Sequence, residues 1–150
     1  PDDGTTRRLH VFGGLEVYRW IDDRWIAVPV QRKRLTLFAY LAVMARPVRR
    51  DVLLGVFWPE SSEASARGAL SKALHYLRAT LGIDCVAATD ETIAVTSTMT
   101  DVVEHRRLLA QGRVAEALQL YRAPLLDGVH LDETPEFERW LDGERARSES

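Results

Sequence analysis

Hydrophobic residues change their spacing along this chain, and the changes predict where strands and helices lie. Over residues 9–30 apolar and polar positions alternate, with turns indicated at Gly13-Gly14 and Asp22-Asp23. This pattern predicts two to four short antiparallel strands. From residue 31 apolar residues recur every three or four positions, which is the spacing of a helix. Helices are expected over residues 31–46, ended by Pro47, and over residues 51–57, ended by Trp58-Pro59.

A third and longer helix is predicted to begin at Ser61 or Ser62, either of which can cap it, and to end at Gly82. Its core side is expected to consist of Ala66, Leu70, Ala73, Leu74, Leu77 and Leu81. Two strand-like runs, residues 85–89 and 92–96, then predict a hairpin around Asp90-Glu91. Strands, three helices and a hairpin in this order are typical of a winged helix, in which the third helix is the recognition helix and the hairpin is the wing. Phe57 and Trp58 are expected to pack where the second helix meets the third helix and the sheet.

After residue 100 the pattern is purely helical. Helices are predicted over residues 101–111 and 113–123, around Gly112, and this unit resembles one tetratricopeptide-type hairpin. A last helix carries an apolar stripe of Phe137, Trp140 and Leu141. Because an exposed apolar stripe is unusual in a monomer, we expect it either to fold back on the first domain or to form a subunit contact.

The predicted fold is therefore α+β, a winged helix-turn-helix with an N-terminal antiparallel sheet, followed by an all-α tetratricopeptide-like region. We expect a flexible tail over residues 1–8, a winged helix over residues 9–98 and a helical region over residues 101–150.

Charge is divided unevenly along the 150 residues, although the net charge is only −2. Residues 31–82 hold nine basic and three acidic residues, whereas residues 101–150 hold seven basic and eleven acidic residues. An anionic partner is therefore expected for the middle of the chain alone, unless the arginines simply form solvated helix faces. Hydrophobic residues make up 46% of the chain, which excludes disorder throughout.

Several classes of protein are disfavoured by the sequence. No apolar run has the length of a membrane helix, and the N-terminus lacks the apolar core of a signal peptide. The single cysteine, Cys85, excludes an internal disulfide, and we therefore expect a cytoplasmic protein. Because the sequence begins with Pro1, we also expect this chain to be a piece of a longer protein.

Enzyme chemistry is also disfavoured, and no metal or cofactor is expected. The four histidines form no close metal-binding pair, and Asp101 with His105 is expected to be a surface helix pair. Cys85 lies in an apolar strand without a basic neighbour, so we expect a buried thiol and not a nucleophile.

The side of the third helix opposite its core stripe is the strongest candidate for a binding surface. It presents Gly68, Ser71, Lys72 and His75, with Arg67 and Arg78 at its flanks. Small residues allow close approach, lysine reaches guanine O6 and N7, and arginines fix phosphates, so this face suits the DNA major groove. The alternatives are a solvated helix face and, for Arg78, an ion pair with Asp51 or Glu60.

Two further basic clusters precede helices. Arg49 and Arg50 stand before the second helix, and Arg32, Lys33 and Arg34 stand before the first. Both clusters are candidates for phosphate contacts, or for solvated helix ends.

Several motifs of the chain resemble a known family, the SARP-type antibiotic regulators, whose DNA-binding domain is an OmpR-like winged helix. The resemblance is carried by Leu9, Val11-Phe12-Gly13-Gly14-Leu15, Val17, Phe57-Trp58-Pro59-Glu60, Ala66-Arg67, Leu70, Leu74, Leu77-Arg78 and Leu81-Gly82. Downstream, the chain is similar to the bacterial transcriptional activator domain that follows in that family, through Ala117-Leu118, Leu120-Tyr121, Leu125-Leu126, Gly128, Glu136-Phe137, Trp140-Leu141 and Glu144-Arg145.

The resemblance implies a bacterial transcriptional activator that binds double-stranded promoter DNA, often as tandem copies on direct repeats, and that contacts RNA polymerase. It makes residues 9–98 the DNA-binding domain and residues 101–150 the truncated start of the activator domain. The wing turn departs from the pattern, because Asp90 and Glu91 are acidic and do not favour phosphate contact. A second hypothesis stays open, in which the winged helix and its helical region bind protein and not DNA inside a larger signalling chain.

Overall fold

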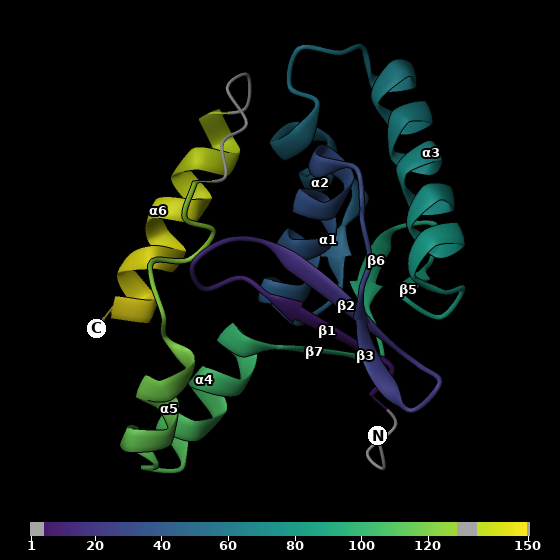
Figure 1. Ribbon diagram of the computed structural model, residues 1–150. Helices are drawn as coiled ribbons and strands as arrows, with labels where there is room; N and C mark the ends of the chain where they lie inside the picture. Colours follow the sequence, from purple (N-terminus) through teal and green to yellow (C-terminus); the bar gives the residue numbers. More distant parts are fainter. Residues whose placement is uncertain (1–4, 129–134, 150) are drawn as a thin grey trace.

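A mixed β-sheet forms the N-terminal side of the computed structural model, which describes residues 5–128 and 135–149 (Figure 1). Its strands are β1 (Arg7–His10), β2 (Glu16–Ile21), β3 (Arg24–Ala27) and β7 (Thr98–Thr100), in the order β3-β2-β1-β7. The antiparallel pairing of β1, β2 and β3 agrees with the prediction. The prediction of a purely antiparallel sheet was wrong, because β7 follows the wing in the sequence and pairs with β1 in parallel.

The prediction of a flexible tail over residues 1–8 is wrong for its last two residues. Arg7 and Arg8 belong to β1, and the Arg7 side chain is buried. Arg7 pairs with both Arg19 and Thr98, so strands distant in sequence order this segment. Residues 1–4 lie outside the described residues.

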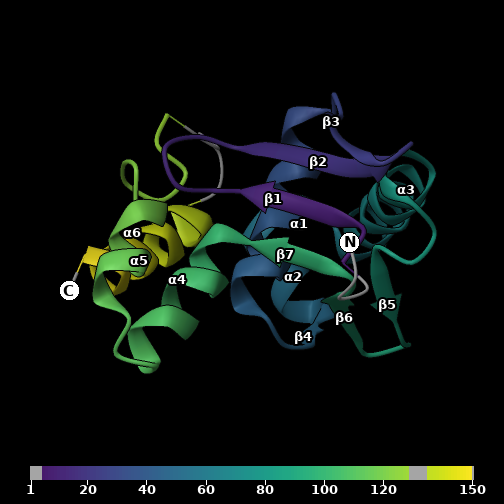
Figure 2. The ribbon, with the colours of Figure 1, turned by 60° about the horizontal axis from the view of Figure 1, so that its bottom comes forward.

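Three helices stand behind this sheet, which Figure 2 turns toward the viewer. They are α1 (Arg32–Met44), α2 (Arg50–Phe57) and α3 (Glu63–Leu81). Ser62 caps α3 by accepting a hydrogen bond from the Ser65 amide at 3.2 Å, and Gly82 follows the last helical residue, as predicted. The six expected core residues of α3 are all buried.

The predicted wing is present beside the third helix. A second sheet has the order β4-β6-β5, with β4 (Val48–Arg49), β5 (Val86–Ala88) and β6 (Thr92–Val95). β5 and β6 form the antiparallel hairpin, and β4 extends it between α1 and α2. A three-helix bundle followed by such a hairpin is a winged helix.

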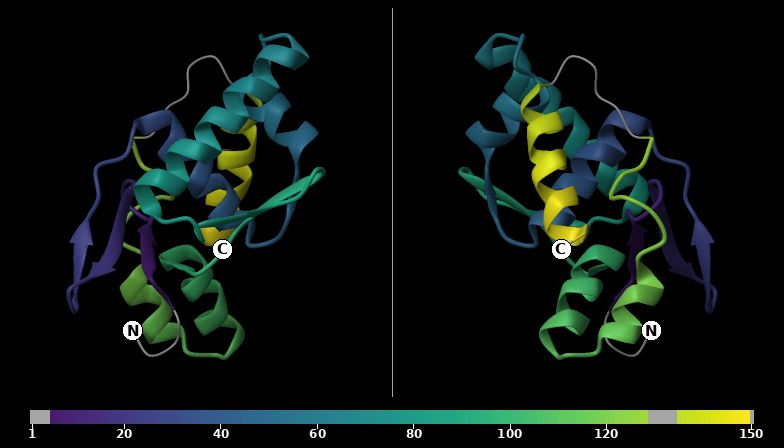
Figure 3. Two further views of the ribbon diagram at one scale, coloured as in Figure 1. Left: turned by 90° about the vertical axis from the view of Figure 1, so that its right-hand side faces the viewer. Right: turned by 90° about the vertical axis from the view of Figure 1, so that its left-hand side faces the viewer.

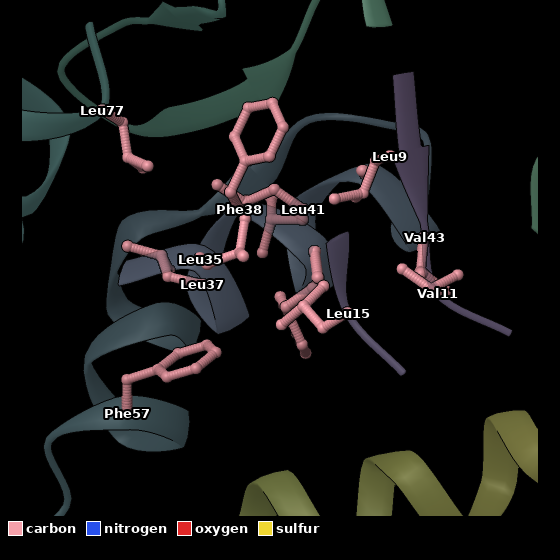
Figure 4. Packing of buried hydrophobic residues seen from close by; sticks show 14 of the residues in the cluster. Leu9, Val11, Leu15, Leu35, Leu37, Phe38, Leu41, Val43, Phe57 and Leu77 are labelled. Carbon is pink, nitrogen blue, oxygen red and sulfur yellow. The ribbon is translucent and has the colours of Figure 1, made fainter. Parts of the chain in front are cut away.

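One hydrophobic core joins the N-terminal sheet to the helices. Leu9, Val11 and Leu15 lie near β1 opposite the residues of α1, with Phe57 of α2 and Leu77 of α3 on other sides (Figure 4). Phe57 is 1% exposed, as expected, whereas Trp58 is half-buried at the edge of this core.

Two helices follow β7 and pack against each other: α4 (Asp101–Ala110) and α5 (Val114–Leu120). The second of them ends three residues earlier than predicted.

The proposed surface pair of Asp101 and His105 was wrong. Both Asp101 carboxylate oxygens accept backbone N–H groups, from Val11 at 2.9 Å and Phe12 at 3.1 Å, and burial raises the pKa of this carboxyl. The His105 ring is buried and its Nδ1 donates to the Ala117 carbonyl at 2.8 Å.

The last helix, α6 (Pro135–Glu149), folds back on the winged helix, which was one of the two outcomes expected for its apolar stripe. Phe137 and Leu141 are fully buried, and the Phe137 ring lies 5.7 Å from that of Phe57. Trp140 donates from Nε1 to the Met44 sulfur at 3.3 Å. The three stripe residues therefore contribute to the intramolecular core, and no partner is needed to cover them.

A buried arginine connects the end of α3 to both sheets. The Arg7 guanidinium donates five hydrogen bonds of 2.9–3.1 Å, and its side chain is 2% exposed. Its acceptors are Thr98 Oγ1, the carbonyls of Leu81, Asp84 and Thr96, and Asp84 Oδ1. The hydrogen bond from Arg7 also holds the pKa of the Asp84 carboxyl below its usual range.

Replacing Arg7 by methionine should lower the free energy of unfolding by about 3 kcal/mol, because buried carbonyls lose their donor. Arg8→Met is the matched control. Its guanidinium lies 4.5 Å from the Trp25 ring centre, and its loss should cost about 1 kcal/mol or less. Urea unfolding of the three proteins measures the difference, and equal losses would contradict this account.

The same substitution should change the acid sensitivity of the fold. A carboxyl whose pKa is lowered by folding stabilises the protein above its unfolded pKa and loses that contribution as the pH falls. The unfolding free energy of the wild type should therefore fall more steeply below about pH 4 than that of the Arg7→Met variant.

Removing the Phe137 ring should cost about 3–5 kcal/mol of unfolding free energy, since the side chain is fully buried. Asp142→Ala, at an exposed position of the same helix, should change stability little. If Phe137→Ala were as stable as the wild type, α6 would not be docked as described.

Candidate nucleic-acid interface

The outer face of α3 presents the side chains that the sequence predicted. Gly68, Ser71, Lys72 and His75 are all exposed, on the side of the helix opposite its buried stripe. Figure 3 shows α3 in front of the bundle, with the wing hairpin reaching out beside it. No ion pair within the described residues holds Lys72 or His75, so both side chains are available to a ligand.

The two arginines at the flanks of this face differ. Arg67 is exposed and forms an ion pair with Glu63, one helical turn earlier. Arg78 is half-buried, and the alternative pairing was wrong, because neither Asp51 nor Glu60 contacts it. A ligand would therefore compete with Glu63 for Arg67, but with no described carboxylate for Arg78.

The two arginines at the start of α2, Arg49 at its N-cap and Arg50 as its first residue, also have partners. Arg49 forms a two-point contact with Asp51, at 3.2 Å from Nε and 3.0 Å from Nη2, and both side chains are largely exposed. Such exposed pairs contribute little stability. They nevertheless reduce the positive charge that a phosphate would meet.

Arg50 connects α2 to the wing turn. Its backbone N–H donates to the Glu91 carbonyl at 2.9 Å, and its Nε donates to the Thr89 carbonyl at 2.8 Å. Thr89 closes the turn, because its hydroxyl accepts from the Thr92 amide at 2.9 Å. Arg50 therefore positions the wing, a role that no local sequence signal indicated.

A wing-side cleft of about 710 Å³ lies between the start of α2, α3 and the wing turn. Its charged lining consists of Arg49, Arg50, Arg67, Asp51, Glu63, Asp90 and Glu91. Four carboxylates thus face three arginines, two of which already form ion pairs. The electrostatic attraction of this cleft for a polyanion is weak.

An α1-side groove of about 480 Å³ lies on the other side of α3. Lys33 and Arg34 line it from α1, Trp58 lines it just after α2, and Gly68 and Lys72 line it from α3. Among the described residues, no carboxylate lines this groove. The two sides of α3 therefore differ in charge, and the basic side was predicted only as a cluster before a helix.

Other chemistry finds no support in the described part of the chain. Cys85 is buried, as expected, and burial raises the pKa of its thiol, which disfavours the nucleophilic thiolate. Among residues 5–128 and 135–149, no group of three histidine, cysteine or acidic side chains is arranged to hold a metal ion. Within those residues, every helix is too short or too polar to cross a membrane.

The fold has a known counterpart. No family model matches the sequence, and no curated protein is found that matches it. A solved structure, Mycobacterium tuberculosis EmbR in complex with a low affinity phosphopeptide, matches with a TM-score of 0.65 at 20% identity. The match covers 96% of this chain and 44% of the EmbR chain, so this chain spans less than half the length of that protein. The likeness confirms an α+β winged-helix fold similar to that of EmbR.

The role of Arg50 can be tested by hydrogen exchange in the wing turn. Arg50→Gln should lower the local stability of the turn by about 1 kcal/mol and speed exchange of the Thr89 and Thr92 amides about fivefold. Arg49→Gln removes a neighbouring charge whose hydrogen bonds within the described residues go to Asp51 and not to the wing turn, so it should leave these amides unchanged. Equal effects of the two substitutions would show that Arg50 does not position the wing.

Proposed function

We propose that this chain binds double-stranded DNA sequence-specifically, as part of a transcriptional regulator, with α3 in the major groove. The observation that supports this most directly is the outer face of α3, where exposed small and hydrogen-bonding side chains stand beside a wing. A helix with a protruding hairpin next to it is a shape that fits a groove and its flanking backbone.

The residues have separate roles in this proposal. Gly68 and Ser71 allow close approach, and Lys72 donates to guanine O6 or N7. His75 contributes less to phosphate attraction than the lysine and arginine side chains do, and its role is mainly packing in the major groove. Arg78 and, after leaving their carboxylates, Arg49 and Arg67 contact the backbone, whereas Arg50 acts through the wing.

The family resemblance adds broader features to the proposal. They are activation of transcription, contact with RNA polymerase, and tandem copies or a homo-oligomer on direct repeats. A cytoplasmic location without enzymatic activity, cofactor or membrane contact is part of the same proposal. The α4–α5 hairpin is interpreted as the first tetratricopeptide-like unit of an activator domain that α6 continues.

A second candidate function is supported by a specific observation. Arg49 and Arg67 form ion pairs, and the wing turn is acidic, which suits a protein partner better than a polyanion. In this alternative the winged helix is a protein-interaction module of a larger signalling chain.

Fluorescence anisotropy on a selected duplex and on scrambled duplexes, at low and high salt, tests the proposal. Lys72→Ala should cost about 1–3 kcal/mol of binding free energy on the selected duplex and little on scrambled DNA, because a base contact is lost. Ser148→Ala, on α6, is the control and should bind as the wild type does.

The outcomes separate the candidates. Equal losses on both duplexes would make Lys72 a phosphate contact instead of a base contact. Wild-type protein that binds no duplex even at low salt would contradict the proposal and favour the protein-binding module.

A further inference from the structure

Two aromatic rings contact two of the cations that line the α1-side groove. The Lys33 ammonium lies 5.2 Å from the ring centre of Trp58, at the end of α2. The Arg34 guanidinium lies 4.6 Å from the ring centre of Tyr76, on α3. The Tyr76 hydroxyl also accepts a hydrogen bond from the Gln31 amide at 2.8 Å, which fixes the start of α1 against α3.

A ring positions a cation without neutralising it. A cation–π contact restricts the side chain and leaves its full positive charge, whereas a carboxylate partner cancels that charge. In the wing-side cleft, Arg49 and Arg67 are paired with carboxylates. In the α1-side groove, Lys33 and Arg34 contact aromatic rings, and they form no ion pair within the described residues.

The groove also adjoins the outer face of α3. Gly68 and Lys72 belong to that face and line the groove as well, so a ligand on the face continues into it. Gly68 has open space where a side chain would stand. Since the major groove is about 12 Å wide, a recognition helix fills it and the two DNA backbones pass along its sides.

We propose that the α1-side groove is a phosphate-binding groove that holds one backbone strand of duplex DNA, with Lys33 and Arg34 as its phosphate contacts. This inference rests on the proposed function and deepens it. The two backbones are held unequally: the strand beside α1 meets ring-held, unpaired cations, and the strand beside the wing meets paired arginines and four carboxylates. In this arrangement Lys33 and Arg34 contact phosphates from α1, whereas Lys72 reads a base from the outer face of α3.

The test measures how duplex affinity depends on salt. A fluorescein-labelled mixed-sequence duplex is titrated with the full chain at several salt concentrations. Each phosphate contact contributes ~0.9 to the slope of log affinity against log salt, so Lys33→Gln with Arg34→Gln should reduce the slope by about two units. Arg113→Gln also removes a positive charge, at the N-cap of α5, and should leave the slope unchanged because α5 lies away from α2 and α3 in Figure 1. Urea unfolding of each variant checks that the fold is kept.

Tyr76→Phe is a second control. It retains the ring under Arg34 and removes only the hydroxyl that contacts Gln31, so the salt slope should stay as in the wild type. The duplex is compared with polyglutamate, a polyanion without phosphate.

Every outcome decides something. If the wild type binds no duplex, the proposed function fails and this inference fails with it. If the wild type binds duplex and the double variant keeps the wild-type slope, the groove is not a phosphate site, although DNA binding stands. If the double variant loses polyglutamate binding but keeps duplex binding, the groove takes an acidic protein segment and the inference is overturned.

Discussion

The buried guanidinium of Arg7 is the constraint on which the arrangement of α3 and the wing hairpin depends. A cation removed from water must have its donors satisfied, and here the acceptors come from the end of α3, the segment before β5, and the segment between β6 and β7. These segments can meet only where one side chain reaches them all. The angle between α3 and the wing hairpin is therefore set by a residue of the first strand, which is distant in sequence and adjacent in space.

Local signals predicted much of the fold. Apolar spacing, the Ser62 cap and Gly82 identified α3, and alternation on either side of Asp90-Glu91 identified the wing. The errors share one cause, which is that long-range contacts have no local signal. Arg7 was assigned to a tail because its acceptors lie more than 70 residues away, and His105 was assigned to the surface because its partner is on the next helix.

The candidate site was predictable only in part, because the sequence has no local signal for long-range contacts. Helical spacing alone brings Gly68, Ser71, Lys72 and His75 to one face, so the sequence identified them together. Whether a cation is free depends on its neighbours in space. Only the structure shows that Arg50 fixes the wing turn and that Trp58 and Tyr76 hold Lys33 and Arg34. The charge difference between the two sides of α3 follows from these contacts, and the count of basic residues did not indicate it.

The parallel pairing of β1 with β7 has a consequence for the order in which the chain assembles. On the ribosome the first strand leaves the exit tunnel long before residues 98–100 have been added, and its parallel neighbour does not yet exist. Until then Arg7 stays in water, since the carbonyls of Leu81, Asp84 and Thr96 have not been brought together. The nascent α3 and wing therefore lack their final mutual orientation until residues 98–100 have also left the tunnel, so the outer face of α3 and the wing take their final arrangement late although their residues are made early.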